Sequence, residues 1–348
     1  MKILEVNDVV KIFKTKGGNV RALNGVSLDI DEGKTVGVVG ESGSGKTTLG
    51  RLIVGLINPD TGSISFEQRS IGSKVNIRHP DIRGKIQLVF QEPSESLDPR
   101  IKVGDSICEP LRGLGIEKSS WNSKLKIVSE KVSLAEEQLS MYPSQLSAGQ
   151  QQRAGIARAL ITDPKLIVLD EPTSALDPTA RAEILSMLQD VQKEFGVSYI
   201  YISHDLSTVR YLTDETAVMY LGEIVEFGET SKIFSRPSHP YSTGLLSSIL
   251  LPDPEIVMDE SLELSGEIPS PINLPKGCFL ESRCPISTKE CSSHHPDLIT
   301  SDDRLVRCFE VEKMKDIVQP SSKFEDFDKS FDDFMTKRYS SSVQAGNN

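Results

Sequence analysis

One eight-residue segment, Gly40–Thr47, constrains the fold of this chain more than any other feature. It reads Gly-Glu-Ser-Gly-Ser-Gly-Lys-Thr, which has the spacing G-x-x-x-x-G-K-[ST] of a phosphate-binding loop. The apolar run at 35–39 before it is typical of a buried strand, and the residues from Thr48 onward favour a helix. The motif requires this strand–loop–helix context, so the sequence predicts a nucleoside triphosphate site.

The residue types of this loop indicate its chemistry. Its glycines let backbone N–H groups turn toward phosphate oxygens, and the dipole of the following helix adds positive potential. Lys46 is expected to reach the β- and γ-phosphates, and the Thr47 hydroxyl is expected to bind Mg²⁺. The predicted nucleotide-binding residues here are Gly40, Glu41, Ser42, Gly43, Ser44, Gly45, Lys46, Thr47 and Thr48.

Composition narrows the class of protein. The 348 residues suffice for more than one domain, and no apolar stretch reaches the length of a transmembrane helix. The N-terminus has an early acid and no apolar core, which argues against a secretory signal. A formal charge of −11 argues against nucleic acid as the main partner, because phosphate contacts need clustered Lys and Arg. We therefore expect an acidic protein of the cytosol.

The order of expected elements indicates an α/β core. Alternating patterns predict strands at 3–12 and 21–30, with a turn at 17–19. Residues 95–150 have a helical pattern and are expected to form an insertion in the core. Other apolar runs predict strands at 63–66, 86–90, 166–169 and 197–202.

The insertion closes on a helix start. Ser147 and Gln150 have the spacing of a capping box, which predicts a helix from there to Leu160. A helix N-terminus also attracts anions, so the residue types alone are compatible with a cap or with a phosphate site.

Two acids and a histidine follow predicted core strands. Asp170 and Glu171 end the strand at 166–169, and His204 follows the strand at 197–202. Beside a phosphate loop, Asp170 is expected to hold Mg²⁺ and Glu171 to polarise the attacking water. Parallel-sheet enzymes gather their active sites at this edge, which favours a catalytic role for His204 over a structural one.

Together these motifs resemble the nucleotide-binding subunit of an ABC transporter, over residues 1–235. The resemblance implies a P-loop NTPase core with an antiparallel β subdomain, and an ATPase coupled to transmembrane transport. The motifs that carry it are the phosphate loop, Gln91, Leu146–Gln150, Leu169–Glu171, Ser174–Asp177 and His204.

The family also implies a shared site. Two subunits would close head-to-tail on two ATP molecules, so that each phosphate loop faces the Ser147–Gln150 segment of the other subunit. Gln91 would sense Mg²⁺, together with Thr47 and Asp170, and touch the membrane partner. Asp177 would contact the other half-site, and His204 would hold the γ-phosphate.

Two further positions come from the family pattern. Phe13 matches the family's adenine-stacking aromatic residue. The usual Leu-Ser-Gly-Gly-Gln reads Leu-Ser-Ala-Gly-Gln here, with Ala148 at the first glycine. Ser147 and Gly149, which approach the γ-phosphate in the family, are kept, so we expect a competent site.

The C-terminal third resembles the extension of oligopeptide/dipeptide importer ATPases, at 236–246, 268–271 and 277–285. Residues 97–111 look more like the second of the two ATPases usually encoded together. The resemblance therefore implies a heterodimer with another ATPase, two membrane permease subunits and, indirectly, an extracellular solute-binding protein. The chain would lie peripherally on the cytoplasmic face of the membrane.

The extension, taken as 236–312, contains four of the five cysteines, and the polar residues 313–348 are expected to be a mostly disordered tail. Four thiolates suit zinc or an iron–sulfur cluster, and the alternative is unrelated reduced thiols. The spacings C-x5-C, C-x6-C and C-x16-C lack the C-x2-C pairs of structural zinc. Related importer ATPases imply a [4Fe–4S] cluster on this small metal-binding extension. The predicted ligands are Cys278, Cys284, Cys291 and Cys308.

Three functions remain in view. The first is a transport ATPase for peptide-like solutes, or for a sugar or metal complex carried by the same architecture. The second is an ABC ATPase acting on DNA or ribosomes, which should carry a long coiled coil or a second cassette, and neither pattern is in this sequence. The third is a metal- or redox-gated regulatory ATPase.

Overall fold

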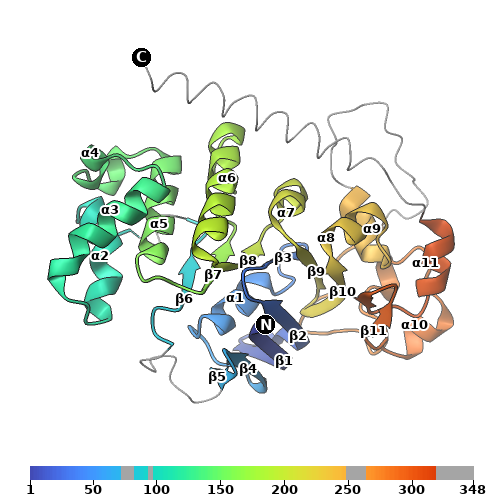
Figure 1. The fold of residues 1–348 in the computed structure, drawn as a ribbon. Helices are drawn as coiled ribbons and strands as arrows, with labels where there is room; N and C mark the ends of the chain where they lie inside the picture. The colour runs from blue at the N-terminus through green and yellow to red at the C-terminus, as the bar shows by residue number, and fades with distance from the viewer. Residues whose placement is uncertain (72–81, 93–96, 248–263, 319–348) are drawn as a thin grey trace. The chain divides into compact units, whose positions relative to one another are not determined.

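The chain forms two compact units, each described by itself. The computed structural model describes residues 1–71, 82–92, 97–247 and 264–318 (Figure 1). The first unit comprises residues 1–214 and 219–224, and the second comprises 215–218 and 225–348.

A parallel sheet forms the core of the first unit. Its strands β3 (Thr35–Val39), β8 (Ser198–Ile202), β7 (Leu166–Asp170) and β6 (Ile86–Val89) pair in that order. Strands covered on both faces are apolar throughout, and β3 and β8 are buried along their whole length. The four strands predicted from apolar runs at these places are confirmed.

Helices pack against this sheet. Gly50 of α1 (Lys46–Ile53) lies so close to β7 and β8 that a Cβ there would approach Val168 and Ile202 to 3.0 and 3.1 Å. The other helices next to the sheet are α5 (Ala148–Leu160), α6 (Pro178–Phe195) and α7 (Leu206–Leu212).

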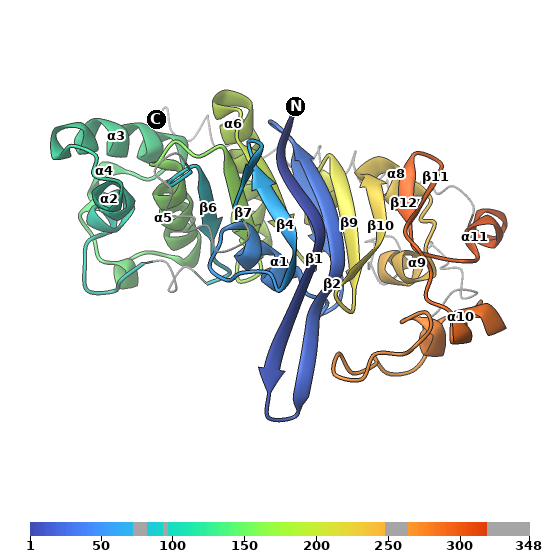
Figure 2. The same cartoon turned by 90° about the horizontal axis from the view of Figure 1, so that it is seen from below.

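A second, antiparallel sheet has the order β2-β1-β4-β5, which confirms the expected β subdomain. Strands β1 (Lys2–Thr15) and β2 (Gly18–Asp31) form a long hairpin (Figure 2). Both exceed the predicted 3–12 and 21–30, because the pairing continues to Thr15 and Gly18 beside the turn. The short strands are β4 (Thr61–Phe66) and β5 (Arg69–Ser70).

The expected helical insertion is present in the described part of 95–150, which begins at residue 97. Its helices are α2 (Val103–Gly113), α3 (Trp121–Lys131) and α4 (Glu136–Leu139), and α5 follows them. The helix predicted from the capping box therefore begins at Ala148, where it was expected.

The second unit contains short strands and helices. Strand β10 pairs with β12, with Glu226 opposite Val306, and β12 pairs with β11. Residues 225–235 therefore belong to the same unit as the residues after 236. The domain boundary expected from the sequence lay between 235 and 236. The elements are β9 (Glu215–Tyr220), β10 (Glu223–Glu229), α8 (Thr230–Ser235), α9 (Pro240–Ser247), α10 (Lys289–Ser293), β11 (Ile299–Ser301), β12 (Arg304–Val306) and α11 (Val311–Ile317).

The tail boundary expected at 313 falls inside α11, whose Met314 is fully buried. Met314 packs with Ile286, so an apolar contact holds this turn of helix in place. The rest of the expected tail, 319–348, lies outside the described residues.

A buried ion pair anchors the second unit. Glu226 is completely buried and accepts hydrogen bonds from the backbone N–H groups of Ser238 (2.8 Å) and His239 (3.1 Å). It also pairs with Arg304 Nη1 at 3.2 Å, and Arg304 donates to the Arg236 carbonyl at 2.7 Å. Burial lowers the pKa of His239 to about 3, so its ring stays neutral at pH 7.

Replacing Glu226 with Gln should destabilise the second unit by about 3–5 kcal/mol, because the buried Arg304 guanidinium loses its counter-charge. Chemical denaturation of the two proteins measures this change in the free energy of unfolding.

Glu229→Gln is the matched control, since Glu229 and Lys232 form an exposed pair at 3.6 Å that should be worth under about 1 kcal/mol. Equal, small losses for the two variants would show that the buried pair does not anchor the unit.

Candidate nucleotide-binding site

The phosphate loop lies between β3 and α1, as predicted. Gly40 and Gly45 have φ of +147° and +107°, and a Cβ on either would overlap a backbone oxygen, that of Met219 or Ala22. Glycine is therefore required at both positions, and the loop can turn its backbone N–H groups toward an anion.

Lys46 points back into the loop. Its Nζ donates to the carbonyl oxygens of Gly40 (2.8 Å) and Glu41 (3.0 Å). Burial lowers the pKa of Lys46, and the carboxylates of Glu171 and Asp170 act in the opposite direction. A buried ammonium held by neutral carbonyls would gain from an anionic ligand, so the β- and γ-phosphates suit this position.

Two side chains predicted to bind Mg²⁺, Thr47 of α1 and Asp170 of β7, lie side by side. The Thr47 hydroxyl donates to Asp170 Oδ1 at 3.2 Å. Burial raises the pKa of Asp170, and the hydrogen bond from Thr47 lowers it. A hydroxyl and a partly buried carboxylate are the hard oxygen donors that Mg²⁺ prefers, so these residues fit the ion.

Glu171, Gln91 and His204 meet at the same edge. Glu171 follows β7 with φ +48°, a strained conformation for a residue other than glycine, and its N–H donates to the Ile202 carbonyl at 2.9 Å. Its Oε2 accepts from Gln91 Nε2 at 3.2 Å and lies 3.0 Å from His204 Nδ1. The arrangement holds a carboxylate where it can accept a proton from water.

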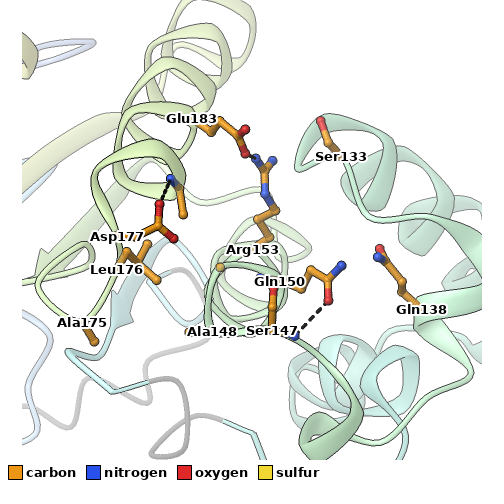
Figure 3. Close-up of a pocket in the computed structure, with 12 residues that line it drawn as sticks. Ser133, Gln138, Ser147, Ala148, Gln150, Arg153, Ala175, Leu176, Asp177 and Glu183 are labelled. Atoms are coloured by element: carbon orange, nitrogen blue, oxygen red, sulfur yellow. Dashed lines mark hydrogen bonds and ion pairs between the residues drawn. The ribbon is translucent and has the colours of Figure 1, made fainter. Parts of the chain in front are cut away.

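A second group of predicted residues lines a cavity of about 680 Å³ (Figure 3). Ser147 caps α5: its Oγ accepts from the Gln150 N–H at 3.3 Å, and Gln150 Oε1 accepts from the Ser147 N–H at 2.9 Å. Asp177 caps α6 by accepting from the N–H groups of Thr179 and Ala180. Two helix N-termini therefore face one cavity, which is a favourable place for an anion.

Gly149, in the same cavity wall, is not required by the chain's own packing. Among the residues that the structure describes, a Cβ there would meet only Ala180 Cβ, at 3.5 Å, which is ordinary contact. Its φ lies outside the left-handed region. The described neighbours of Gly149 therefore do not require glycine at this position.

Phe13 lies near the tip of the β1–β2 hairpin and is 38% exposed. It pairs with Val20, two residues along β2 from Ala22, whose carbonyl adjoins Gly45 of the phosphate loop. An adenine ring on Phe13 would thus lie near the phosphate site.

The structure separates the predicted residues into two groups. Lys46, Thr47, Asp170, Glu171, Gln91 and His204 form one connected network, whereas Ser147, Gly149, Gln150 and Asp177 line the cavity, which no residue of the phosphate loop lines.

Sequence reasoning missed two arginines that join these motifs. Arg153 pairs with Glu183 at 3.0 Å, and Arg181 donates to Asp205 (2.7 Å) and to the Leu176 carbonyl (3.2 Å). Arg153 lies six residues after the cap Ser147, and Arg181 lies four residues after the cap Asp177. Their place on the helix that follows each cap is the only signal that the sequence offers.

The four C-terminal cysteines form no disulfide bonds and lie within residues 278–308. Burial raises the pKa of Cys284 to about 11 and of Cys308 to about 12, and the neighbouring cysteines act in the same direction. The Cys278 N–H donates to the Cys291 carbonyl at 2.8 Å. Within the described residues, however, no three His, Cys, Asp or Glu side chains are placed to hold a metal ion, so the arrangement does not support the predicted metal-binding extension.

Comparison with known proteins shows which family the chain resembles. The family model described as "ABC transporter" matches residues 23–174, and that described as "Oligopeptide/dipeptide transporter, C-terminal region" matches 225–291. The oligopeptide transport ATP-binding protein OppF of Salmonella typhimurium is 39% identical over 324 residues, which cover 90% of this chain and 97% of OppF. The dipeptide transport ATP-binding protein DppF of Haemophilus influenzae is 44% identical over 307 residues, covering 87% and 93%.

Solved structures give the same result. The ATP-binding cassette MJ0796, solved as a dimer in a post-hydrolysis state with ADP and Pi, superposes with a TM-score of 0.60 at 28% identity. The superposed region covers 65% of this chain and 98% of the MJ0796 chain. No helix in the described part of the chain is long and apolar enough to cross a membrane. By its sequence and its fold, the chain belongs to the ABC transporter family and is an ATPase of the oligopeptide/dipeptide type.

Proposed function

We propose that this chain hydrolyses ATP to power the import of oligopeptides or dipeptides through a membrane ABC transporter. The observation that carries the proposal is the network of Glu171, Gln91 and His204 beside the Thr47–Asp170 pair. The names of its relatives and the match at 225–291 favour peptides over a sugar or a metal complex.

The residues divide the work of hydrolysis. Lys46 exchanges its two carbonyl contacts for the β- and γ-phosphates, and Thr47, Asp170 and Gln91 would hold Mg²⁺, which neutralises charge on the phosphates. Glu171 accepts the proton of the attacking water. His204, whose ring contacts Glu171, holds the γ-phosphate.

The remaining predicted residues act on the nucleotide of a second subunit. Support comes from the cavity at the N-termini of α5 and α6, from Gly149 in its wall, where a Cβ would make only ordinary contact with Ala180 among the described residues, and from the dimeric cassette MJ0796. Ser147, Gly149 and Gln150 would contact the partner's γ-phosphate, and Asp177 would contact the other half-site.

The same proposal includes the assembly. The partner is a different, homologous ATPase, and two membrane permease subunits bind the pair at the cytoplasmic face of the membrane. A solute-binding protein delivers the peptide to the permeases. Support comes from the resemblance of residues 97–111 to the second ATPase of such pairs and from the OppF and DppF relatives.

Glu171→Gln should lower ATP turnover by about 10²-fold or more and leave ATP binding intact, because the variant lacks the general base. Phosphate release from the assembled transporter measures turnover, and uptake of a labelled peptide by cells that carry only the variant should fall with it.

Glu194→Gln makes the same charge change at an exposed pair with Lys131, 2.7 Å apart, and should leave turnover unchanged. Turnover of Glu171→Gln within a few-fold of the wild type would contradict the catalytic role. The transport role would be contradicted if cells that lack the chain took up the labelled peptide as fast as wild-type cells.

Ser147→Arg should abolish hydrolysis at the site whose phosphate loop belongs to the partner, because the larger cation fills the cavity in front of α5. The site formed by this chain's own phosphate loop should still bind ATP. Selective loss of the chain's own ATP binding would instead show that Ser147 acts within one subunit.

For the four cysteines we infer a [4Fe–4S] cluster, with zinc as the alternative. Their number supports it, as do the Glu310 N–H that donates to Cys308 Sγ at 3.3 Å and the resemblance to importer ATPases. The thiols would have to turn toward a common centre, since they do not form a ready ligand set. The cluster's role would be to hold a small region with few apolar contacts together.

Anaerobically purified protein should contain iron and acid-labile sulfide in about equal amounts, and Cys284→Ser should lose both while ATP binding persists. Cys108, which is buried in α2, provides the matched control as Cys108→Ser. Zinc without sulfide would select the alternative, and the absence of any metal would leave four reduced thiols.

A further inference from the structure

The side chain of Lys11 covers one face of the exposed Phe13 ring. Its Nζ lies 5.6 Å from the ring centroid, within the range of a cation–π interaction. Both residues belong to β1, near the tip of the hairpin, and Phe13 pairs with Val20, two residues from Ala22, whose carbonyl lies beside Gly45 of the phosphate loop.

Lys11 is fixed in this position by the turn before β4. Its Nζ donates to the Asn58 carbonyl at 2.7 Å and to Asp60 Oδ1 at 3.2 Å, and its side chain is only 15% exposed. These two oxygens take two of the three N–H groups of the ammonium, so one remains to face the ring.

Asp60 holds the backbone of β1 at the same point. Its Oδ2 accepts from the Ile12 N–H at 2.6 Å, where the β1–β2 register is irregular between Lys11 and Ile12. The Ile12 N–H, and then Lys11, keep the pKa of Asp60 below its usual range, so the carboxylate stays ionised. The Asp60 side chain thus holds both the backbone of Ile12, the residue before Phe13, and the Lys11 ammonium that lies over the Phe13 ring.

We propose that Lys11, held by Asp60 and the Asn58 carbonyl, is a positioning residue that fixes the Phe13 ring for stacking on the adenine of ATP. The inference rests on the proposed function, in which Phe13 receives the base. Lys11 occupies one face of the ring, and the base takes the other. Lys11 therefore contributes to recognition of the base and makes no contribution to binding of the triphosphate.

The test compares the binding of ATP, which carries the adenine base, with that of inorganic triphosphate, which lacks it. Displacement of a fluorescent ATP analogue gives the affinity of the full chain for Mg²⁺-ATP and for inorganic triphosphate. Lys11→Met should weaken ATP by about two- to five-fold, the size of an exposed cation–π interaction, and leave triphosphate unchanged. Phe13→Leu should weaken ATP by about ten-fold, and adding Lys11→Met to it should cause no further loss.

Two matched variants separate positioning from folding. Lys11→Arg keeps a cation over the ring and should retain the affinity for ATP. Lys16→Met removes the same charge from the exposed turn of the same hairpin and should change neither ligand.

Three results would overturn the inference. Lys11→Met could leave ATP binding unchanged, or weaken ATP and triphosphate equally, as a general disturbance of the hairpin would. Phe13→Leu could leave ATP binding unchanged, which would remove the adenine site itself. Failure of the unaltered chain to bind either ligand would overturn the proposed function as well, and this outcome is distinguishable from the three results above.

Discussion

The alignment of parallel strands in one sheet is the constraint on which the nucleotide site depends. Strand β3 leads into the phosphate loop, β7 ends on Asp170, and β8 leads to His204. Because β8 pairs with both β3 and β7, the carboxyl ends of all three lie together. The pairing of Asp170 with Ile202 sets the register, and a shift by one residue would turn Asp170 away from Thr47.

Two helix caps define the other half of the chemistry. Ser147 and Asp177 satisfy the first N–H groups of α5 and α6, so the caps stabilise the helices whatever else they do. The same geometry leaves two positive helix ends at one open cavity. In the proposed function this cavity receives the nucleotide of another subunit, which explains why the chain holds all the parts of a site but in two separate places.

Local sequence patterns predicted most of this arrangement. The phosphate loop, the apolar strands and the capping box depend on residues close together in the chain, so their positions were predicted correctly from Gly40 to His204. The length of the β1–β2 hairpin was underestimated, because it depends on pairing between strands. Glu226 and Arg304, 78 residues apart, gave no signal, and neither did the contact of Lys11 with Asp60. The clustering of four cysteines and the family resemblance predicted a metal site, which the side-chain arrangement of the described residues does not support.

The central claim is that this chain carries two incomplete half-sites and needs a second ATPase subunit to hydrolyse ATP. The most direct measurement is the rate of ATP hydrolysis per mole of chain, across a range of protein concentrations, with and without the second ATPase. The account predicts a low rate for the dilute chain alone that rises steeply when the second subunit is added. A high rate that is independent of concentration in the isolated, monomeric chain would contradict it.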